Sequence, residues 1–151
     1  MKSKFLLFIV AGIIFVAILS IFLNSRADIE EESGLLYIKN KKVNLIIADT
    51  KLSRVHGLSS MEFLPKDSAM LFVFEDLDKY GFWMKDMKFP IDIIWADQDK
   101  KIVHIEKNIS PSTYPRIFFP PQKSLYVLEA NAFFTDENGF KVGNILNFYK
   151  K

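Results

Sequence analysis

Short apolar runs separated by polar turns follow one another along the chain from residue 35 onward, a pattern typical of β-strands. Gly, Pro, Asn and Asp bound most of these runs, which predicts seven or eight short strands. The close spacing favours a compact β fold, because a βαβ fold needs longer helical crossovers. The predicted strands cover Leu35–Lys39, Val43–Ala48, Ala69–Phe74, Tyr80–Met84, Ile91–Ala96, Ile102–Lys107, Ser124–Ala130 and Ile145–Tyr149.

The segments between the strands predict two hairpins, two short helices and one irregular loop. Residues 40–42 and 97–101 have the length and polarity of hairpin loops. Lys51–His56 follows an Asp-Thr N-cap and precedes a glycine, and Ala132–Asn138 also ends at a glycine. Four prolines between residues 111 and 121 predict an extended loop without regular structure. We therefore expect a mainly β domain: a small antiparallel-rich β-sandwich or flattened barrel with two short helices.

The N-terminal part of the chain has a different pattern. Phe5–Leu23 contains 17 apolar residues in 19, and a helix of this length spans about 28 Å, close to the hydrocarbon core of a bilayer. Lys2 and Lys4 precede this run, and Arg26 alone follows it before the acidic residues begin. The positive-inside rule then predicts one transmembrane helix with its N-terminus in the cytoplasm. The membrane is thus a predicted partner through Phe5–Leu23, with the C-terminal domain outside the cytoplasmic membrane.

A cleaved signal peptide is the alternative interpretation of this segment. The small residue Ala27 fits a cleavage site, which would leave a secreted or periplasmic protein. In either case the predicted organisation is the same. Residues 1–27 form a signal anchor or signal peptide, 28–34 an acidic tether and 35–151 a β-rich exported domain.

Composition and charge exclude several classes of protein. The chain has no cysteine, which excludes a disulfide framework, a thiolate zinc site, an iron–sulfur cluster and a cysteine nucleophile. The chain has a net charge of +2, but from Asp28 onward 17 basic residues face 18 acidic ones. The exported part therefore has no excess of positive charge that would indicate a nucleic-acid partner.

Six short strings occur in a fixed order through the predicted β domain. They are Arg54-Val55-His56-Gly57-Leu58, Met70-Leu71-Phe72-Val73-Phe74, Phe82-Trp83-Met84-Lys85, Pro90-Ile91-Asp92-Ile93, Tyr126-Val127-Leu128-Glu129 and Gly139-Phe140-Lys141-Val142-Gly143. Together they resemble the domain of unknown function 192 family, also called uncharacterised protein family 0127, over about Val43–Phe148. The resemblance implies a small β-sandwich-like domain of bacteria and archaea, often exported, with no established activity.

The chain departs from the family pattern at three places. Asp86-Met87 stands where many members have Asn-Thr, and Asn144 stands where an Asp is common. Many members carry a Cys pair in the proline-rich loop, whereas Ser112–Pro115 contains none. A crosslink or thiol chemistry in this loop is therefore excluded for this chain.

Asp92 is the first candidate ligand-binding residue, because strand alternation places it on an otherwise apolar face, opposite to Ile93. A carboxylate in such a place needs a cation or hydrogen-bond donors. Arg54 is the predicted partner, with Lys85 as the second choice. Two interpretations stay open: a ligand-binding carboxylate in a pocket, or an internal ion pair that fastens the short helix to the sheet.

Trp83, Lys85 and Glu129 add further candidates. An aromatic ring beside a cation, as in Trp83 and Lys85, could stack a sugar, a peptide side chain or another planar ligand. Core packing by Trp83 with Lys85 extending into solvent is the structural alternative. Glu129 places another carboxyl group on an apolar strand face. The candidate ligand-binding residues are thus Arg54, Trp83, Lys85, Asp92 and Glu129.

No complete catalytic or metal-binding motif is present. The chain has no HExxH string, no Gly-x-Ser-x-Gly elbow and no glycine-rich phosphate loop, so we predict no metal and no cofactor. The sequence favours a noncatalytic ligand-binding or accessory module for a small molecule, a glycan or a peptide. The alternative is a small hydrolase or lyase that uses Asp92, Glu129 or His104, with the two carboxyl groups as an acid/base pair.

Overall fold

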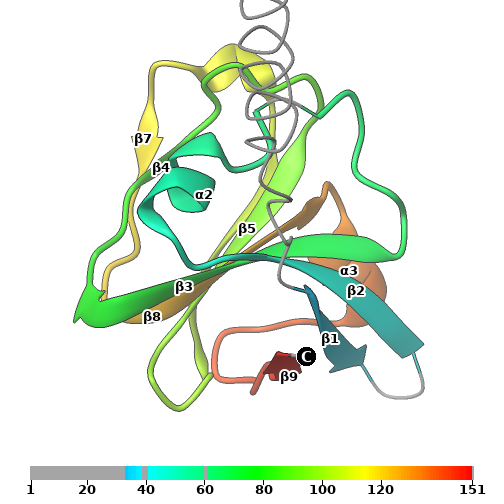
Figure 1. Cartoon of the computed structure of the whole chain (residues 1–151), viewed down its shortest axis with the longest axis vertical. Coiled ribbons are helices and arrows are strands. Elements are labelled where there is room, and N and C mark those ends of the chain that lie inside the picture. Colours follow the sequence, from blue (N-terminus) through cyan, green and yellow to red (C-terminus); the bar gives the residue numbers. More distant parts are fainter. Residues whose placement is uncertain (1–32, 39–40, 60, 151) are drawn as a thin grey trace, which may run out of the picture. The chain divides into compact units, whose positions relative to one another are not determined.

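The computed structural model describes residues 33–38, 41–59 and 61–150, and Figure 1 shows how their elements are arranged. The strands are β1 (Ser33–Ile38), β2 (Lys41–Ala48), β3 (Ser68–Asp78), β4 (Phe82–Trp83), β5 (Ile91–Ala96), β6 (Ile102–Ile109), β7 (Ile117–Phe118), β8 (Ser124–Asn131) and β9 (Asn147–Lys150). The helices are α2 (Lys51–His56), α3 (Phe134–Asn138) and the 3-10 helix η1 (Pro111–Thr113). The predicted apolar run Phe5–Leu23 lies outside the described residues. Within those residues no helix is long and apolar enough to cross a membrane.

One large sheet carries the fold, with the strand order β6-β5-β8-β3-β2-β1-β9. Five of its six strand pairs are antiparallel, which confirms the antiparallel-rich prediction. The exception is the parallel pair β2–β3, joined by a crossover of residues 49–67 that contains α2. No crossover of this kind was expected. Parallel strands are usually connected by a long helix, whereas the helix predicted between these two strands has only six residues.

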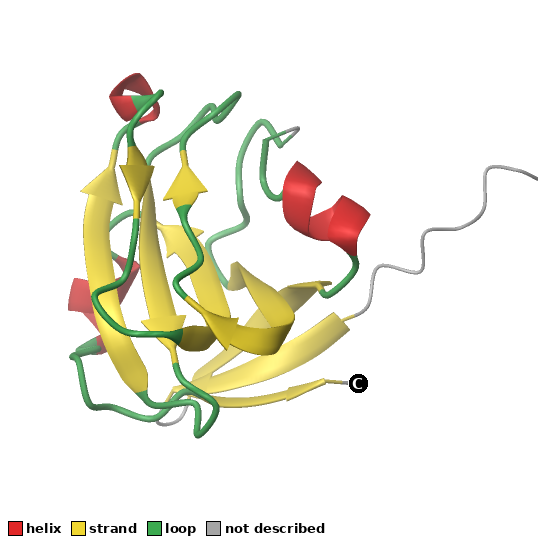
Figure 2. Ribbon diagram, turned by 90° about the vertical axis from the view of Figure 1, so that its left-hand side faces the viewer, coloured by secondary structure: helices red, strands yellow, loops and turns green. Residues whose placement is uncertain are grey.

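The sheet curls strongly but does not close, so the flattened-barrel alternative is wrong (Figure 2). Among the described residues, the edge strands β6 and β9 share no continuous ladder. A single bridge between Lys101 and Ile145 joins the regions next to them. The second sheet of the described part is small and consists of β4 and β7.

Local sequence patterns predicted several elements correctly. The two predicted hairpins are present as β1–β2 and β5–β6. Helix α2 begins at Lys51 because Thr50 and Ser53 form a capping box, with 3.0 Å and 3.1 Å hydrogen bonds between each side chain and the other backbone N–H. It ends at Gly57, whose φ of 52° is readily adopted only by glycine. β1 begins at Ser33, two residues before the predicted start of the domain.

The proline-rich segment differs from its prediction as a structureless loop. It contains η1 and the strand β7, whose Ile117 and Phe118 pair with Trp83 and Phe82. The pairing partners are more than 30 residues apart along the chain, so neither segment signals the pairing by itself.

The two faces of the large sheet each bury a separate apolar core, and one short helix lies on each face (Figure 1). The core on the α2 side contains Leu58, Met70, Phe72, Met84, Ile93, Trp95 and Val127 among others. The core on the α3 side contains Leu36, Val43, Leu71, Ile94, Leu128, Phe134 and Phe148 among others. The predicted alternation in β5 is thereby confirmed, because Ile93 and Ile94 belong to different cores.

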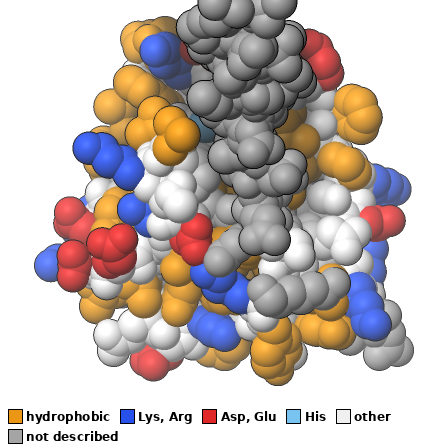
Figure 3. Space-filling view, viewed as in Figure 1, with side chains coloured by type: hydrophobic (Ala, Val, Ile, Leu, Met, Phe, Trp, Pro, Cys, Tyr) orange, Lys and Arg blue, Asp and Glu red, His pale blue; other side chains and the backbone are white. Residues whose placement is uncertain are grey.

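On the face viewed in Figure 3, basic and acidic side chains are interspersed with hydrophobic ones. This agrees with the near balance of charges in the sequence from Asp28 onward.

Candidate functional site

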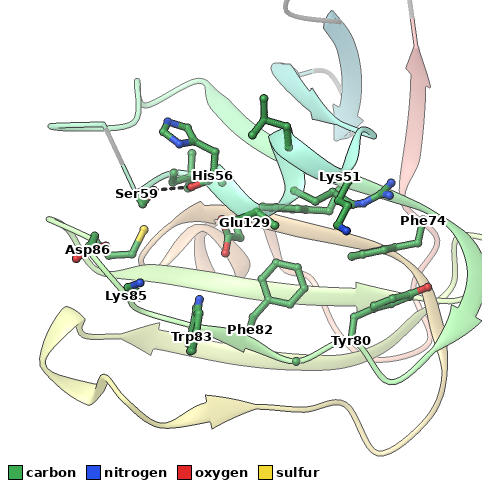
Figure 4. A pocket seen from close by; sticks show the side chains of 18 residues that line it. Lys51, His56, Ser59, Phe74, Tyr80, Phe82, Trp83, Lys85, Asp86 and Glu129 are labelled. Carbon is green, nitrogen blue, oxygen red and sulfur yellow. Dashed lines mark hydrogen bonds between the residues drawn. The ribbon is translucent and has the colours of Figure 1, made fainter.

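A pocket of about 630 Å³ opens on the α2 side of the sheet (Figure 4). Helix α2 forms one wall, the segment from Tyr80 to Met87 forms the other, and residues of β3 and β8 form the floor. Four of the five candidate residues line this pocket, namely Arg54, Trp83, Lys85 and Glu129. We call this cavity the α2 pocket.

Glu129 lies at the floor of the α2 pocket, in the middle of β8. Its strand neighbours in register are Met70 on β3 and Ile93 on β5, both members of the apolar core. Only 4% of Glu129 is exposed, and no residue of the described part hydrogen-bonds or ion-pairs with its side chain. Burial raises the pKa of Glu129 to about 8, because the apolar surroundings disfavour the charged form. At neutral pH this carboxyl group is therefore mostly protonated and can donate a hydrogen bond.

Arg54 fastens the α2 wall to the sheet. Its Nη1 donates to the backbone oxygens of Asp49, at 2.6 Å, and Val73, at 2.8 Å. Its guanidinium group lies 5.2 Å from the centre of the Phe74 ring and 3.9 Å from the exposed carboxylate of Glu75. Arg54 thus lines the pocket, and two of its five N–H donors, both on Nη1, hold the crossover against β3.

Aromatic side chains form much of the opposite wall. Tyr80 stacks on Phe74 with ring centres 3.4 Å apart, and Phe82 packs edge-on against Phe72 at 4.9 Å. Trp95 of the core donates from Nε1 to the backbone oxygen of Tyr80 at 2.9 Å, which fixes the start of this wall. Partial burial, followed by the carboxylates of Asp78 and Asp76, raises the pKa of the Tyr80 phenol.

Trp83 and Lys85 lie at the rim of the α2 pocket. Trp83 is 49% exposed and packs edge-on against Tyr114, so it is not an ordinary core residue. The Lys85 ammonium nitrogen lies 5.9 Å from the centre of the Trp83 ring. The predicted aromatic–cation pair is therefore formed, on a surface that a ligand can reach.

Asp92 does not belong to this site, and its predicted ion pair with Arg54 or Lys85 is wrong. It is fully buried on the α3 side and accepts four hydrogen bonds. The donors are the backbone N–H groups of Asn108 (2.8 Å), Phe133 (3.2 Å) and Thr135 (2.9 Å), together with the Thr135 hydroxyl (2.6 Å). These donors satisfy the carboxyl group without a cation.

The backbone around Asp92 explains this arrangement. Asn108 and Phe133 both have left-handed φ angles, 49° and 70°, which are uncommon outside glycine. The β5–β6 register shifts opposite Asp92, and α3 begins immediately after Phe133. Asp92 therefore holds a β-bulge and the start of α3 in place, which is a structural role.

The predicted acid/base pair of Asp92 and Glu129 is wrong because the two carboxyl groups lie on opposite faces of the sheet. His104 does not line the α2 pocket; it contacts Glu106 at 3.1 Å and the Trp95 ring at 5.4 Å between ring centres. Within the described ranges, no group of three or more His, Asp or Glu side chains could hold a metal ion.

Sequence reasoning missed much of the pocket wall. Lys51, Val55, Phe72, Tyr80 and Phe82 all line the cavity but were not among the candidate residues. The exposed apolar residue Val55, 79% accessible on a capped helix, is the signal that could have directed attention to α2. The crossover that brings this helix over Glu129 is not visible in local sequence patterns.

Comparisons with known proteins agree with the fold. A candidate transcription regulator from Sinorhizobium meliloti 1021 matches with a TM-score of 0.69 and 24% identity, over 79% of this chain and 92% of that one. A protein of unknown function from Novosphingobium aromaticivorans DSM 12444 matches with a TM-score of 0.68 and 23% identity, over 76% of this chain and 83% of that one. At these identities the likeness concerns the fold alone. No curated protein matches the chain significantly.

The family model described as "Uncharacterized ACR" matches residues 34–148, which is nearly the whole β domain. The chain therefore belongs to the domain of unknown function 192 (DUF192) family.

Proposed function

We propose that the β domain is a noncatalytic ligand-binding module and that its ligand occupies the α2 pocket. The observation that carries this proposal is Glu129, a buried carboxyl group that opens into the cavity and has no partner within the described residues. Among the described residues, no fully buried side-chain oxygen or nitrogen lacks a hydrogen-bond partner, so the Glu129 carboxyl oxygens are reached from the cavity. A ligand atom in the pocket can therefore hydrogen-bond with them.

The shape and chemistry of the pocket support the same function. A cavity of about 630 Å³ falls in the usual range for small-molecule sites, which are mostly apolar with a few polar groups. Here the apolar surface comes from residues such as Phe82 and Leu58, and the polar side chains of the lining include Glu129, Lys51 and Lys85. The alternative of a hydrolase or lyase loses support, because Asp92, Glu129 and His104 do not converge.

We also propose that the domain acts outside the cytoplasmic membrane, anchored by Phe5–Leu23. The support is the length and apolarity of this run and the lysines that precede it. The neighbour from S. meliloti is described in terms of transcription, but we propose no nucleic-acid function here. The near balance of charges from Asp28 onward offers no electrostatic basis for binding to nucleic acid.

A thermal-shift screen of the full-length protein in detergent tests ligand binding. The panel contains sugars, cell-wall fragments, peptides and organic acids, since a ligand at 100 times its Kd adds about 2.7 kcal/mol to the free energy of unfolding. The shift should disappear in Glu129→Leu, which removes the polar anchor, and persist in Lys123→Gln, an exposed residue outside the pocket lining. A panel without any stabilising compound, or equal shifts in both variants, would contradict the proposal.

A further inference from the structure

We infer that the α2 pocket binds a small organic anion with a ring, placing its anionic group at one of the two rim lysines, Lys51 or Lys85, and a hydroxyl or carbonyl oxygen at Glu129. This inference rests on the proposed function and names the ligand class for that site. It is carried by the distribution of charges around the cavity, the position of the Glu129 carboxyl group and the aromatic wall.

The charges around the pocket favour an anion. Lys51 and Lys85 are exposed at the rim, and within the described residues neither ammonium group makes an ion pair or a hydrogen bond. Arg54 adds a third cation to the lining, whereas Asp86 is the only lining carboxylate besides Glu129. A ligand anion at either lysine would form a charge-assisted hydrogen bond that the free protein lacks.

Among the described residues, the charged and titratable groups that line the pocket together with Glu129 belong to its two walls. Helix α2 contributes Lys51, Arg54 and His56, and the opposite segment contributes Tyr80, Lys85 and Asp86. The adjacent strands present apolar neighbours at the Glu129 register. Figure 4 shows the Glu129 carboxyl group directed into the space between these two walls.

The protonation of Glu129 argues against an amine ligand. With its pKa near 8, the buried carboxyl group is mostly neutral at pH 7 and presents a donor as well as an acceptor. An ammonium ligand would gain only a hydrogen bond to a neutral carboxyl group, without an ion pair, and would also face the positive rim. An anionic ligand with a hydroxyl or carbonyl oxygen uses the neutral form directly.

The aromatic wall supplies the surface for a ring. Phe82 and Trp83 line one side of the cavity, while Val55 and Leu58 line the side of α2. A pyranose or an aromatic ring offers a flat apolar face to such a slot while its substituents reach the polar groups. Both kinds of ligand would thus carry a ring, an anionic group and a hydroxyl or carbonyl oxygen. The experiment distinguishes the pyranose from the aromatic ring.

The test uses two sets of ligands that differ at one substituent, which is anionic, neutral or cationic. One set is glucuronate, glucose and 6-amino-6-deoxyglucose; the other is 4-hydroxybenzoate, 4-hydroxybenzyl alcohol and 4-hydroxybenzylamine. Calorimetric titration of the full-length protein at about pH 6.5 should show the anion of at least one set binding about tenfold more tightly than its neutral partner. The amine should bind most weakly in that set.

Variants then locate the ligand. Either Lys51→Gln or Lys85→Gln should weaken binding of the anion about tenfold, the scale of one charge-assisted hydrogen bond, and so identify the lysine that holds the anionic group, while Lys123→Gln should leave the affinity unchanged. Affinity of the wild type should fall about tenfold per pH unit above pH 8 with proton uptake on binding. Glu129→Gln, which keeps a donor and an acceptor, should bind without this decline.

Three results would overturn the inference. They are tightest binding by the amine, anion binding that neither lysine variant weakens, and no binding by any of the six compounds. These results concern the ligand class alone. The broader thermal-shift screen decides separately whether the pocket binds any ligand, so failure of the inference and failure of the proposed function are distinguishable.

Discussion

Glu129 and Asp92 are buried carboxyl groups on adjacent strands of one sheet, yet their surroundings differ completely. Asp92 receives four hydrogen bonds, three of them from backbone N–H groups. Glu129 receives none from the described residues and opens into a cavity. The described residues satisfy the hydrogen-bonding capacity of Asp92. The Glu129 side chain can form a hydrogen bond with a molecule that enters the cavity.

Replacing Glu129 by Gln should stabilise the free protein at neutral pH. Burial raises the pKa of Glu129 from 4.5 to about 8, so between these values the folded state binds more protons than the unfolded state. Stability of the wild type therefore falls as pH rises through this window, and Gln removes the loss. We expect a gain of about 3 kcal/mol at pH 7, measured by chemical denaturation.

The pH profile distinguishes this effect from a general change in packing. At about pH 4 the carboxyl group is neutral in both states, so the wild type and Glu129→Gln should have similar stabilities. The difference should grow up to about pH 8 and then stay constant. A difference that does not depend on pH would show that the ionisation of Glu129 does not govern its stability effect.

Replacing Asp92 by Ala should destabilise the protein by about 4 kcal/mol, because three backbone N–H groups, that of Thr135 buried and those of Asn108 and Phe133 partly buried, lose their acceptor. Asp92→Asn keeps one acceptor oxygen and should cost about half as much. Urea denaturation measures both values. If Asp92→Ala left the stability unchanged, the carboxyl group would not hold the bulge and the start of α3.

The sequence located these residues more successfully than their partners. Alternation in β5 placed Asp92 correctly on the face opposite to Ile93, because strand geometry has a fixed period of two. The choice of Arg54 as its partner failed since backbone donors leave no trace in residue type. Two of these donors depend on left-handed backbone conformations at Asn108 and Phe133. Neither residue is a glycine, so the sequence does not signal these conformations.

At the scale of elements, α2 depends on a single side chain for much of its attachment to the sheet. Helix α2 has no buried residue, and Leu52 is 73% exposed. Arg54 bridges the backbone oxygens of Asp49 and Val73. The position of the pocket wall therefore relies on two hydrogen bonds more than on apolar packing by the helix itself.

Replacing Arg54 by Met should loosen α2 while leaving the rest of the domain folded. The variant keeps an apolar stem but loses both hydrogen bonds, each worth about 1 kcal/mol. Amide hydrogen exchange should become faster in residues 51–57 and remain slow in β5 and β8. Arg54→Lys, whose ammonium group can still donate hydrogen bonds but stands on a shorter side chain, should have an intermediate effect.

Exchange that accelerates equally in all elements would contradict this local role of Arg54.

Signals within α2 and within the hairpins were readable from the sequence because their residues lie close together in the chain. The β4–β7 pair and the parallel β2–β3 pair were not, since each joins segments separated by a long connection. Pairings of that kind depend on the whole core and not on local residue preferences.

At the scale of the whole molecule, we predict one orientation in the membrane. If Phe5–Leu23 spans the bilayer with Lys2 and Lys4 inside, the β domain lies outside. Protease added to spheroplasts should then degrade the domain without lysis. A cytoplasmic marker protein that stays intact is the control, and a domain that is cleaved only after lysis would refute this orientation.

The crossover between β2 and β3 has a consequence for how specificity could change within this architecture. Residues 49–67 carry one wall of the pocket, yet none of them belongs to a strand of the large sheet. Insertions or substitutions there would alter what the cavity accepts while the ladder contacts of all seven strands stay the same. The fold thus separates the sheet from a connection that can vary, and ligand preference can diverge without a change of topology.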